Sequence, residues 1–283
     1  MKKYSILFMV IAIILFISCS KDDNDYDDGT WSTVEMTIDV TKAPMKIWAA
    51  GEGERMHTDW GDGSSSNSGA KDSHTYTAPG NYKIIVKVRN MKHSGVLYYY
   101  SSVHFKDCPD LERIISYSSG SLHDTLTIPK TIKFENCPNL QSIRLYDQRI
   151  TNLEIENCPQ IKYLDCSNHR LSSFNLDIPL LEELNCSGGI LKELDLSHFP
   201  VLKILNCGGN KLSDIDLKNC SNLVELICSY NQLTELDVSN NTKLKSLSCE
   251  NNYDLKTIWV WEGFDIRNKD FRVPESVEYK TNK

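Results

Sequence analysis

The sequence predicts a mainly β protein, in which a small strand-rich domain is followed by a repeat solenoid. Apolar residues recur at a nearly constant interval through the C-terminal half of the 283-residue chain. Between residues 31 and 88, by contrast, apolar and polar residues alternate with a period of two, which is typical of strands. Hydrophobic residues at 40% and charged residues at 24% fit an ordinary folded protein.

The repeat is clearest between Leu202 and Leu223, where the residues read L-x-x-L-x-C-x-x-N-x-L-x-x-I-x-L. Its first apolar position recurs after intervals of 29, 21, 20, 21, 21 and 21 residues, at Leu111, Leu140, Ile161, Leu181, Leu202, Leu223 and Leu244. A period of this length indicates a leucine-rich repeat solenoid, whose units must stack because none can bury its own apolar side. The long first interval predicts a loop around 118–130, where adjacent His123 and Asp124 lack a nucleophile and give no catalytic signal.

Each repeat is expected to contain two short extended stretches, and alternate residues of the first should face solvent. The early repeats carry basic and aromatic residues at these outward positions, and the later repeats carry polar and acidic ones. Tyrosine and arginine commonly anchor interfaces, although any solenoid must expose some of them. The candidate binding residues are therefore Arg113, Tyr117, Arg144, Tyr146 and Tyr163.

Acidic residues recur in the second stretch, and the column contains Glu154, Asn175, Asp195, Asp216 and Asp237 beside Glu193, Asp214 and Glu235. Calcium could bridge such a column, but a solvated, screened face accounts for it better and is the interpretation we adopt. After residue 252 the repeat decays. Trp259, Trp261, Phe264 and Phe271 are expected to cover the end of the core.

Nine of the ten cysteines occupy two fixed positions of the repeat. One column holds Cys166, Cys186, Cys207, Cys228 and Cys249, and the other holds Cys108, Cys137, Cys158 and Cys220. Parallel Cβ vectors in stacked rungs do not favour disulfides, and no C-x-x-C pair suggests zinc, so we expect buried free thiols. This repeat resembles those of listerial internalins with a cysteine ladder and of Bacteroides-type surface leucine-rich repeat proteins.

The first domain has strand signals at Trp31–Val40, around Ile47 and at Tyr82–Val88. Asp59-Trp60-Gly61-Asp62-Gly63, followed by His74-Thr75-Tyr76 and Gly80-Asn81-Tyr82, resembles the W-G-D-G, H-x-Y and G-x-Y-x-V signature of PKD-type β-sandwiches. The resemblance implies a sandwich that serves as a spacer or binding module. Asp59, Asp62 and His74 could also be read as a metal cluster, but their spacing matches no metal motif and we interpret them as turn residues.

At the N-terminus, Lys2 and Lys3 precede a short apolar run over residues 6–17, which fits a secretory signal better than a membrane span. Residues 16–19, Phe-Ile-Ser-Cys, resemble a bacterial lipobox, which implies lipidation of Cys19; an uncleaved anchor helix is the alternative. The following Lys21-Asp22-Asp23 resembles the export signal of Bacteroides-type lipoproteins, and this implies an outward-facing outer-membrane location, although any acidic tether looks similar.

We therefore expect a signal peptide over residues 1–18, a tether over 19–30, the PKD-like sandwich over 31–100, the solenoid over 101–252 and a cap over 253–283. The net charge of −7 argues against nucleic acid as a partner. No catalytic, cofactor or metal motif is present, so an enzyme is not expected. By resemblance, the prediction is a monomeric surface lipoprotein that binds a host or matrix protein in adhesion, and the alternatives are capture of glycans and a structural spacer in the envelope.

Overall fold

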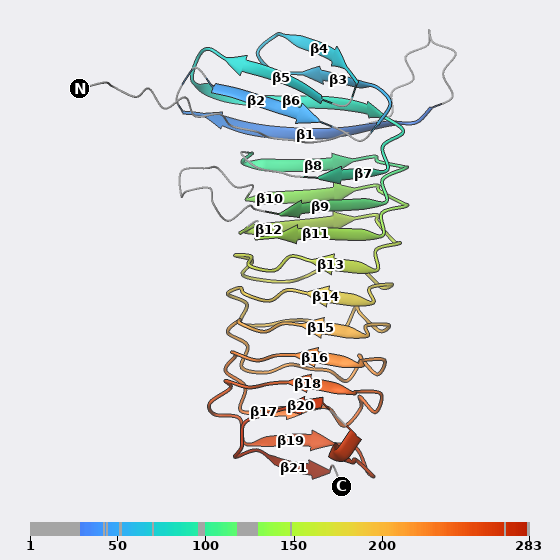
Figure 1. Cartoon of the computed structure of the whole chain (residues 1–283), viewed down its shortest axis with the longest axis vertical. Helices are drawn as coiled ribbons and strands as arrows, with labels where there is room; N and C mark the ends of the chain where they lie inside the picture. Colours follow the sequence, from blue (N-terminus) through green and yellow to red (C-terminus); the bar gives the residue numbers. More distant parts are fainter. Residues whose placement is uncertain are drawn as a thin grey trace, which may run out of the picture.

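The computed structural model describes residues 29–41, 43, 45–50, 53–69, 71–95, 100–117, 130–147, 149–268 and 270–281. It is an elongated stack of strands with β4 at one end and β21 at the other (Figure 1). Cys19 and residues 118–129 of the expected loop lie outside the described residues. In the part that is described, no helix is long and apolar enough to cross a bilayer.

One side of the stack is a nine-stranded parallel sheet. Its outermost strands are β20 and β7, and neighbouring strands come from consecutive repeats. The strands, from the N-terminal end, are β7 (His93–Gly95), β9 (Arg113–Tyr117), β11 (Ser142–Tyr146), β13 (Tyr163–Asp165), β14 (Glu183–Asn185), β15 (Ile204–Asn206), β16 (Glu225–Ile227), β18 (Ser246–Ser248) and β20 (Asp270–Arg272). The repeat register is kept: Leu184, Leu205, Leu226 and Leu247 lie beside one another in the sheet. The structure thus confirms the predicted parallel solenoid.

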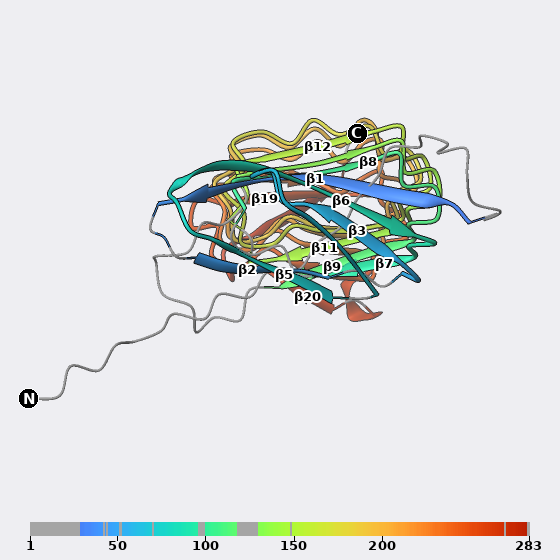
Figure 2. The same ribbon diagram turned by 90° about the horizontal axis from the view of Figure 1, so that it is seen from above.

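The opposite side begins with a seven-stranded sheet that joins the first domain to the solenoid. In spatial order it contains β12 (Asn152–Glu156), β10 (Thr131–Glu135), β8 (Ser102–Lys106), β1 (Trp31–Val40), β6 (Gly80–Arg89), β3 (Met56–Asp59) and β4 (Ser65–Ser68). β1 pairs antiparallel with both β6 and β8, and β8 then pairs parallel with β10. The first domain therefore lies over the end of the solenoid core (Figure 2).

A small antiparallel sheet of β2 (Met45–Ala50) and β5 (Lys71–Tyr76) completes the first domain. Ile47 of β2 is fully buried and belongs to the same core as Val34 and Met36 of β1. The alternating stretches expected to be strands are therefore strands, with the bounds of β1, β2 and β6. That this domain is PKD-like stays a prediction.

The motif residues of the first domain meet in one cluster. The Trp60 and His74 rings stack with centroids 5.1 Å apart, and Tyr76 stacks on Tyr82 at 4.1 Å. Tyr76 Oη donates to the Trp60 carbonyl at 2.6 Å, and His74 Nε2 lies 2.7 Å from Asp62 Oδ2. Asp62 Oδ1 also accepts from the Ser64 amide and hydroxyl, which lowers the pKa of Asp62. These contacts support the interpretation of the motif as a turn scaffold.

The solenoid core is filled by the repeated leucines and by both cysteine columns. All nine cysteines within the described residues are buried and free, as predicted. Burial raises the pKa of Cys166, Cys186, Cys207 and Cys228 well above its ordinary value, so these thiols stay protonated. They pack as small apolar groups.

The turns after the strands of the nine-stranded sheet are held by buried asparagine side chains. Asn231 Oδ1 accepts from the Leu212 amide at 3.0 Å, while its Nδ2 donates to the carbonyls of Cys207 and Cys228 at 3.1 and 3.0 Å. Asn210 and Asn252 make equivalent bonds in the adjacent rungs. Each asparagine thus connects its own rung to the preceding ones.

His169 takes the place of asparagine in an earlier rung. Its Nδ1 accepts from the Leu171 amide at 2.9 Å and its Nε2 lies 3.0 Å from the Cys186 carbonyl. An amide can only donate and a carbonyl can only accept, so the imidazole is neutral with its proton on Nε2. Its side chain is buried, and this burial lowers the pKa of His169.

This histidine predicts a loss of stability in mild acid. Below about pH 6.5 the imidazole of residue 169 binds a proton in the unfolded chain but not in the folded one. The contribution of His169 to the free energy of unfolding is therefore complete above that pH, and it declines as the pH falls towards the lower pKa of the folded state. The melting temperature of the wild type should therefore drop, relative to that of His169→Asn, between pH 7.5 and 5.5. An unchanged difference between the two proteins would contradict the prediction.

At the C-terminal end, β17 (Glu235–Asp237), β19 (Thr257–Val260) and β21 (Glu278–Thr281) form a three-stranded parallel sheet. The short 3-10 helix η1 (Ile266–Asn268) connects β19 to β20. Trp261, Phe264 and Phe271 are partly buried against the core, as expected of the cap. Trp259 lies in β19 and donates from Nε1 to Glu235 Oε2 at 3.0 Å.

Candidate functional site

The candidate site is the solvent-facing side of β9, β11 and β13, which are consecutive neighbours in the nine-stranded sheet. Two columns of outward residues cross these strands. Arg113, Ser142 and Tyr163 form one column, in which Ser142 is buried, and Ile115, Arg144 and Asp165 form the other. Side chains along a column are only one strand spacing apart, about 4.8 Å, so one partner can contact several of them.

The structure brings four of the five predicted residues onto this face. Arg113 and Arg144 are exposed, whereas Tyr146 and Tyr163 are half-buried. Tyr117 ends β9 and pairs with Tyr146 in the sheet register; its side chain lies outside the described residues. Ile115, between Arg113 and Tyr117 in sequence, exposes 39% of its surface and adds an apolar element. We define Arg113, Ile115, Arg144, Tyr146 and Tyr163 as the upper patch.

Neither arginine of the upper patch is engaged within the described part of the chain. The ion pairs and hydrogen bonds there include no contact of the Arg113 or Arg144 guanidinium groups, although Asp165 is the sheet neighbour of Arg144. Asp165 instead accepts from the Ser167 amide at 2.9 Å and from Asn185 Nδ2 at 2.8 Å. The upper patch therefore presents two exposed cations beside apolar and aromatic surface.

Below the upper patch the same face is mostly polar and internally bonded, apart from the half-buried Ile204 and Ile227. Asn185 Oδ1 accepts from the Ser187 hydroxyl at 2.7 Å, and the hydroxyls of Ser229 and Ser248 lie 2.8 Å apart. Asn206 Oδ1 accepts from the Gly208 amide at 3.1 Å. These side chains satisfy one another, so the lower rungs offer fewer unsatisfied groups to a partner than the upper patch does.

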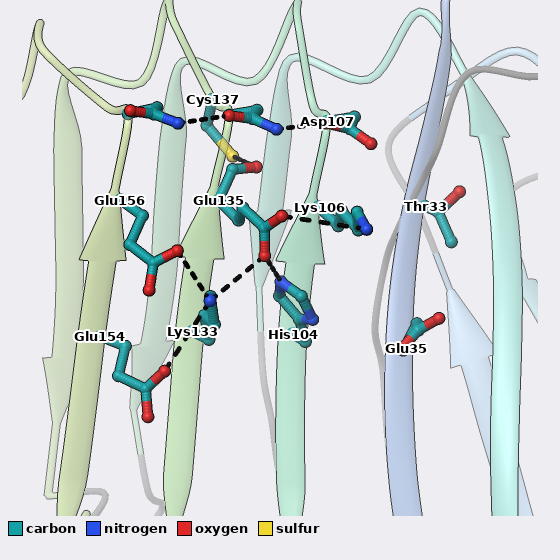
Figure 3. A network of polar contacts seen from close by, with 12 residues as sticks. Thr33, Glu35, His104, Lys106, Asp107, Lys133, Glu135, Cys137, Glu154 and Glu156 are labelled. Carbon is teal, nitrogen blue, oxygen red and sulfur yellow. Dashed lines mark hydrogen bonds and ion pairs between the residues drawn. The ribbon is translucent and has the colours of Figure 1, made fainter.

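The opposite face carries a charged network across β8, β10 and β12 (Figure 3). Lys133 lies 2.8 Å from Glu156, 3.2 Å from Glu135 and 3.9 Å from Glu154. The hydrogen bond to Glu156 raises the pKa of Lys133. Burial acts to raise the pKa of Glu135, but Lys133 outweighs it and the pKa is lowered overall. Lys133 separates the three carboxylates, and Lys106 lies 3.8 Å from Glu135, so most of the negative charge of this cluster is offset within the sheet.

The lower acidic residues of that face are engaged by their own turns. Asp195, Asp216 and Asp237 each accept from the amide two residues ahead, at 2.9, 3.1 and 2.8 Å. The hydrogen bonds from Ser197 lower the pKa of Asp195, and the one from the Lys218 side chain lowers the pKa of Asp216. Within the described ranges there is no group of three or more histidine, cysteine or acidic residues arranged to hold a metal. Turn capping accounts for the repetition of these acids.

The buried polar residues that hold the rungs together were not among the residues predicted from the sequence. The asparagine at the ninth position of the repeat was visible in the pattern, and its recurrence at 210, 231 and 252 was the available signal. His169 gave a weaker signal, because it is the only residue of its type at this position. The structure shows that all four are structural residues.

These features define the chain as a parallel β-solenoid with leucine-rich repeats. No family model and no curated protein matches the chain. Among solved structures, YopM from Yersinia enterocolitica WA-314 is 26% identical, with a TM-score of 0.43 over 62% of this chain and 38% of that one. The functional domain of InlJ from Listeria monocytogenes, described as including a cysteine ladder, is 17% identical, with a TM-score of 0.37 over 69% of this chain and 55% of that one. The chain thus spans less than two thirds of either structure.

Proposed function

We propose that the chain is a non-enzymatic, surface-displayed lipoprotein whose solenoid binds a protein partner through the upper patch. The observation that carries this proposal is the pair of exposed, unengaged guanidinium groups of Arg113 and Arg144 next to Ile115, Tyr146 and Tyr163. Arginine and tyrosine combine charge or hydrogen bonding with large apolar area, which suits the centre of a protein interface. The expected partner presents carboxylates beside apolar side chains, as a host or matrix protein can.

The location is proposed from the N-terminal sequence. A signal-like segment, Cys19 and the acidic residues 22–28 would place the folded domains outside the outer membrane. The elongated shape supports this arrangement, because the solenoid extends away from the first domain, which follows the tether in sequence (Figure 1).

Binding should depend on the charge of Arg144. We expect Arg144→Glu to weaken binding to the protein partner by about tenfold or more, because the substitution replaces attraction of the partner's carboxylates with repulsion in the middle of the upper patch. Intact cells displaying the wild type or the variant would be applied to arrays of matrix proteins and glycans, at low and high salt. Arg170→Glu is the matched control, because Arg170 is also exposed but lies beyond the strand, at the turn.

The same experiment separates the alternatives. Capture of a glycan would persist in high salt and fail with Tyr146→Ala or Tyr163→Ala, because stacking on sugar rings does not need the charge.

Protease treatment of intact cells tests surface display and should release peptides from residues 161–256. Protection of these peptides, with the protein present in lysates, would contradict surface display and favour an envelope spacer. Binding that no patch variant changes would contradict the assigned face.

A further inference from the structure

The C-terminal end of the stack exposes two edge strands with the same short pattern. β20 reads Asp270-Phe271-Arg272, and β21 contains Glu278-Tyr279-Lys280. Each is the last strand of its sheet and pairs on one side only within the described residues, β20 with β18 and β21 with β19. At the other end the first domain covers the solenoid (Figure 1). The C-terminal end therefore presents open edges, and open edges are prone to pair with another strand.

The open hydrogen-bonding groups belong to the central aromatic residue of each pattern. In β20, the Asp270 amide donates to the Lys245 carbonyl at 3.0 Å and the Arg272 carbonyl accepts from the Cys249 amide at 2.9 Å. Backbone groups of successive residues alternate in direction along a strand, so the amide and carbonyl of Phe271 point away from β18. In β21 the Glu278 amide donates to the Lys256 carbonyl at 2.9 Å. By the same alternation, the backbone amide and carbonyl of Tyr279 point away from β19.

Both patterns are self-complementary when read in opposite directions. If β20 pairs antiparallel with β20 of a second copy, centred on Phe271, the two Phe271 residues exchange both backbone hydrogen bonds. Asp270 of each copy then lies opposite Arg272 of the other copy. The same pairing of β21, centred on Tyr279, places Glu278 opposite Lys280. Opposite charges directly across an antiparallel pair stabilise it, whereas like charges destabilise it.

One symmetry axis serves both strands. A two-fold axis that runs across this end of the stack, close to β20 and β21 and at right angles to both strands, reverses the direction of both edge strands at once. The ring of Phe264 lies 5.6 Å from that of Phe271 and 5.4 Å from that of Tyr279, so both central residues lie beside Phe264 at the same end of the core. A single axis can therefore pass close to both.

We propose that this end is the docking surface for a second copy of the chain, forming a two-fold dimer in which both sheets continue from one copy into the other. The contact is isologous, because each copy presents the same two edges. It also shields the half-buried Phe264, Phe271 and Tyr279 from solvent. This inference replaces the monomer expected from the sequence and is independent of the partner bound by the upper patch.

Sedimentation of the full chain in a density-matched detergent tests the dimer. We expect a concentration-dependent dimer for the wild type. Asp270→Arg and Arg272→Asp should each raise the dissociation constant about tenfold or more, because each sets like charges opposite one another. Both side chains are exposed, so the monomer fold should survive, and circular dichroism would verify this.

Two charge-reversal experiments that should restore dimerisation make the test specific to the proposed register. An equimolar mixture of the Asp270→Arg and Arg272→Asp proteins should form a heterodimer, and the protein with both substitutions should dimerise with itself again. A wild type that stays monomeric at about 100 μM, well above the dissociation constants of stable interfaces, would overturn the proposal. So would dimerisation unaffected by the single substitutions, which would assign the association to another surface or to the N-terminal segment.

Discussion

Asn231→Ala is expected to destabilise the solenoid by about 3 kcal/mol, because a buried backbone group left without a partner costs roughly 1–3 kcal/mol. The substitution removes the acceptor of the Leu212 amide and one donor each from the carbonyls of Cys207 and Cys228. Only 7% of Asn231 is exposed, so water cannot readily replace these bonds. The shift in the midpoint of urea unfolding measures the effect.

The matched control is Asn222→Ala. Asn222 is also an asparagine of the solenoid and donates to the Pro200 carbonyl at 3.1 Å, but its side chain is partly exposed and the freed carbonyl can be hydrated. We expect a change within about 0.5 kcal/mol. Hydrogen exchange gives a second test, since loss of Asn231 should speed exchange of the Leu212 amide first. Equal effects of the two substitutions would show that the buried bonds contribute little.

The sequence predicts the regular parts of this fold because they follow local patterns. The 21-residue period places Leu184, Leu205, Leu226 and Leu247 side by side, and the cysteine columns follow the same register. The alternation of residues 31–40 likewise predicts β1. In these segments the side of the strand that must be buried is visible in the residues themselves.

The joining of the two domains could not be predicted in the same way. β1 pairs with β8, in a register where Val34 lies beside Phe105 and Met36 beside Val103, although more than sixty residues separate them in the chain. A period of two shows that a strand has a buried face but not which strand lies next to it. The first domain and the solenoid therefore look independent in sequence, whereas one sheet runs through both.

The second stretch of each repeat shows a related limit. It forms β10 and β12 in early repeats and β17, β19 and β21 near the end, but residues 172–176, 191–196 and 212–217 form no strand. Leu176, Ile215 and Leu217 are nevertheless buried there as the pattern predicts. Burial is fixed by the alternation of apolar residues, whereas strand pairing requires neighbouring rungs to approach closely enough for backbone hydrogen bonds. The upper patch follows the same logic: exposure of Arg113 and Arg144 was predictable, but the absence of an ion pair with Asp165 was not.

Gly189→Ala should destabilise the chain by about 2 kcal/mol, the usual cost of an added carbon in a tightly packed interior. A Cβ at this position would lie 2.4 Å from Cε1 and Nε2 of His169 and 2.7 Å from Oδ1 of Asn210. Neither neighbour can move without losing its hydrogen bonds to the Leu171 and Leu191 amides. Gly69→Ala is the control, because a Cβ there meets no atom within 4 Å, and its unfolding midpoint should stay close to that of the wild type.

The clash predicts that His169 and Gly189 are energetically coupled. The imidazole is longer than the asparagine side chains of the later rungs, and glycine at 189 provides the space that its outer ring atoms occupy. In the background of His169→Asn, the Gly189→Ala substitution should therefore cost less, and a double-mutant cycle should give a coupling of about 1 kcal/mol. Additive effects would mean that the penalty at 189 arises from Asn210 alone. Coupling would instead show that His169 and Gly189 depend on each other. The titratable imidazole replaces the neutral amide of asparagine at this position, and glycine at the same position of the following rung leaves room for it.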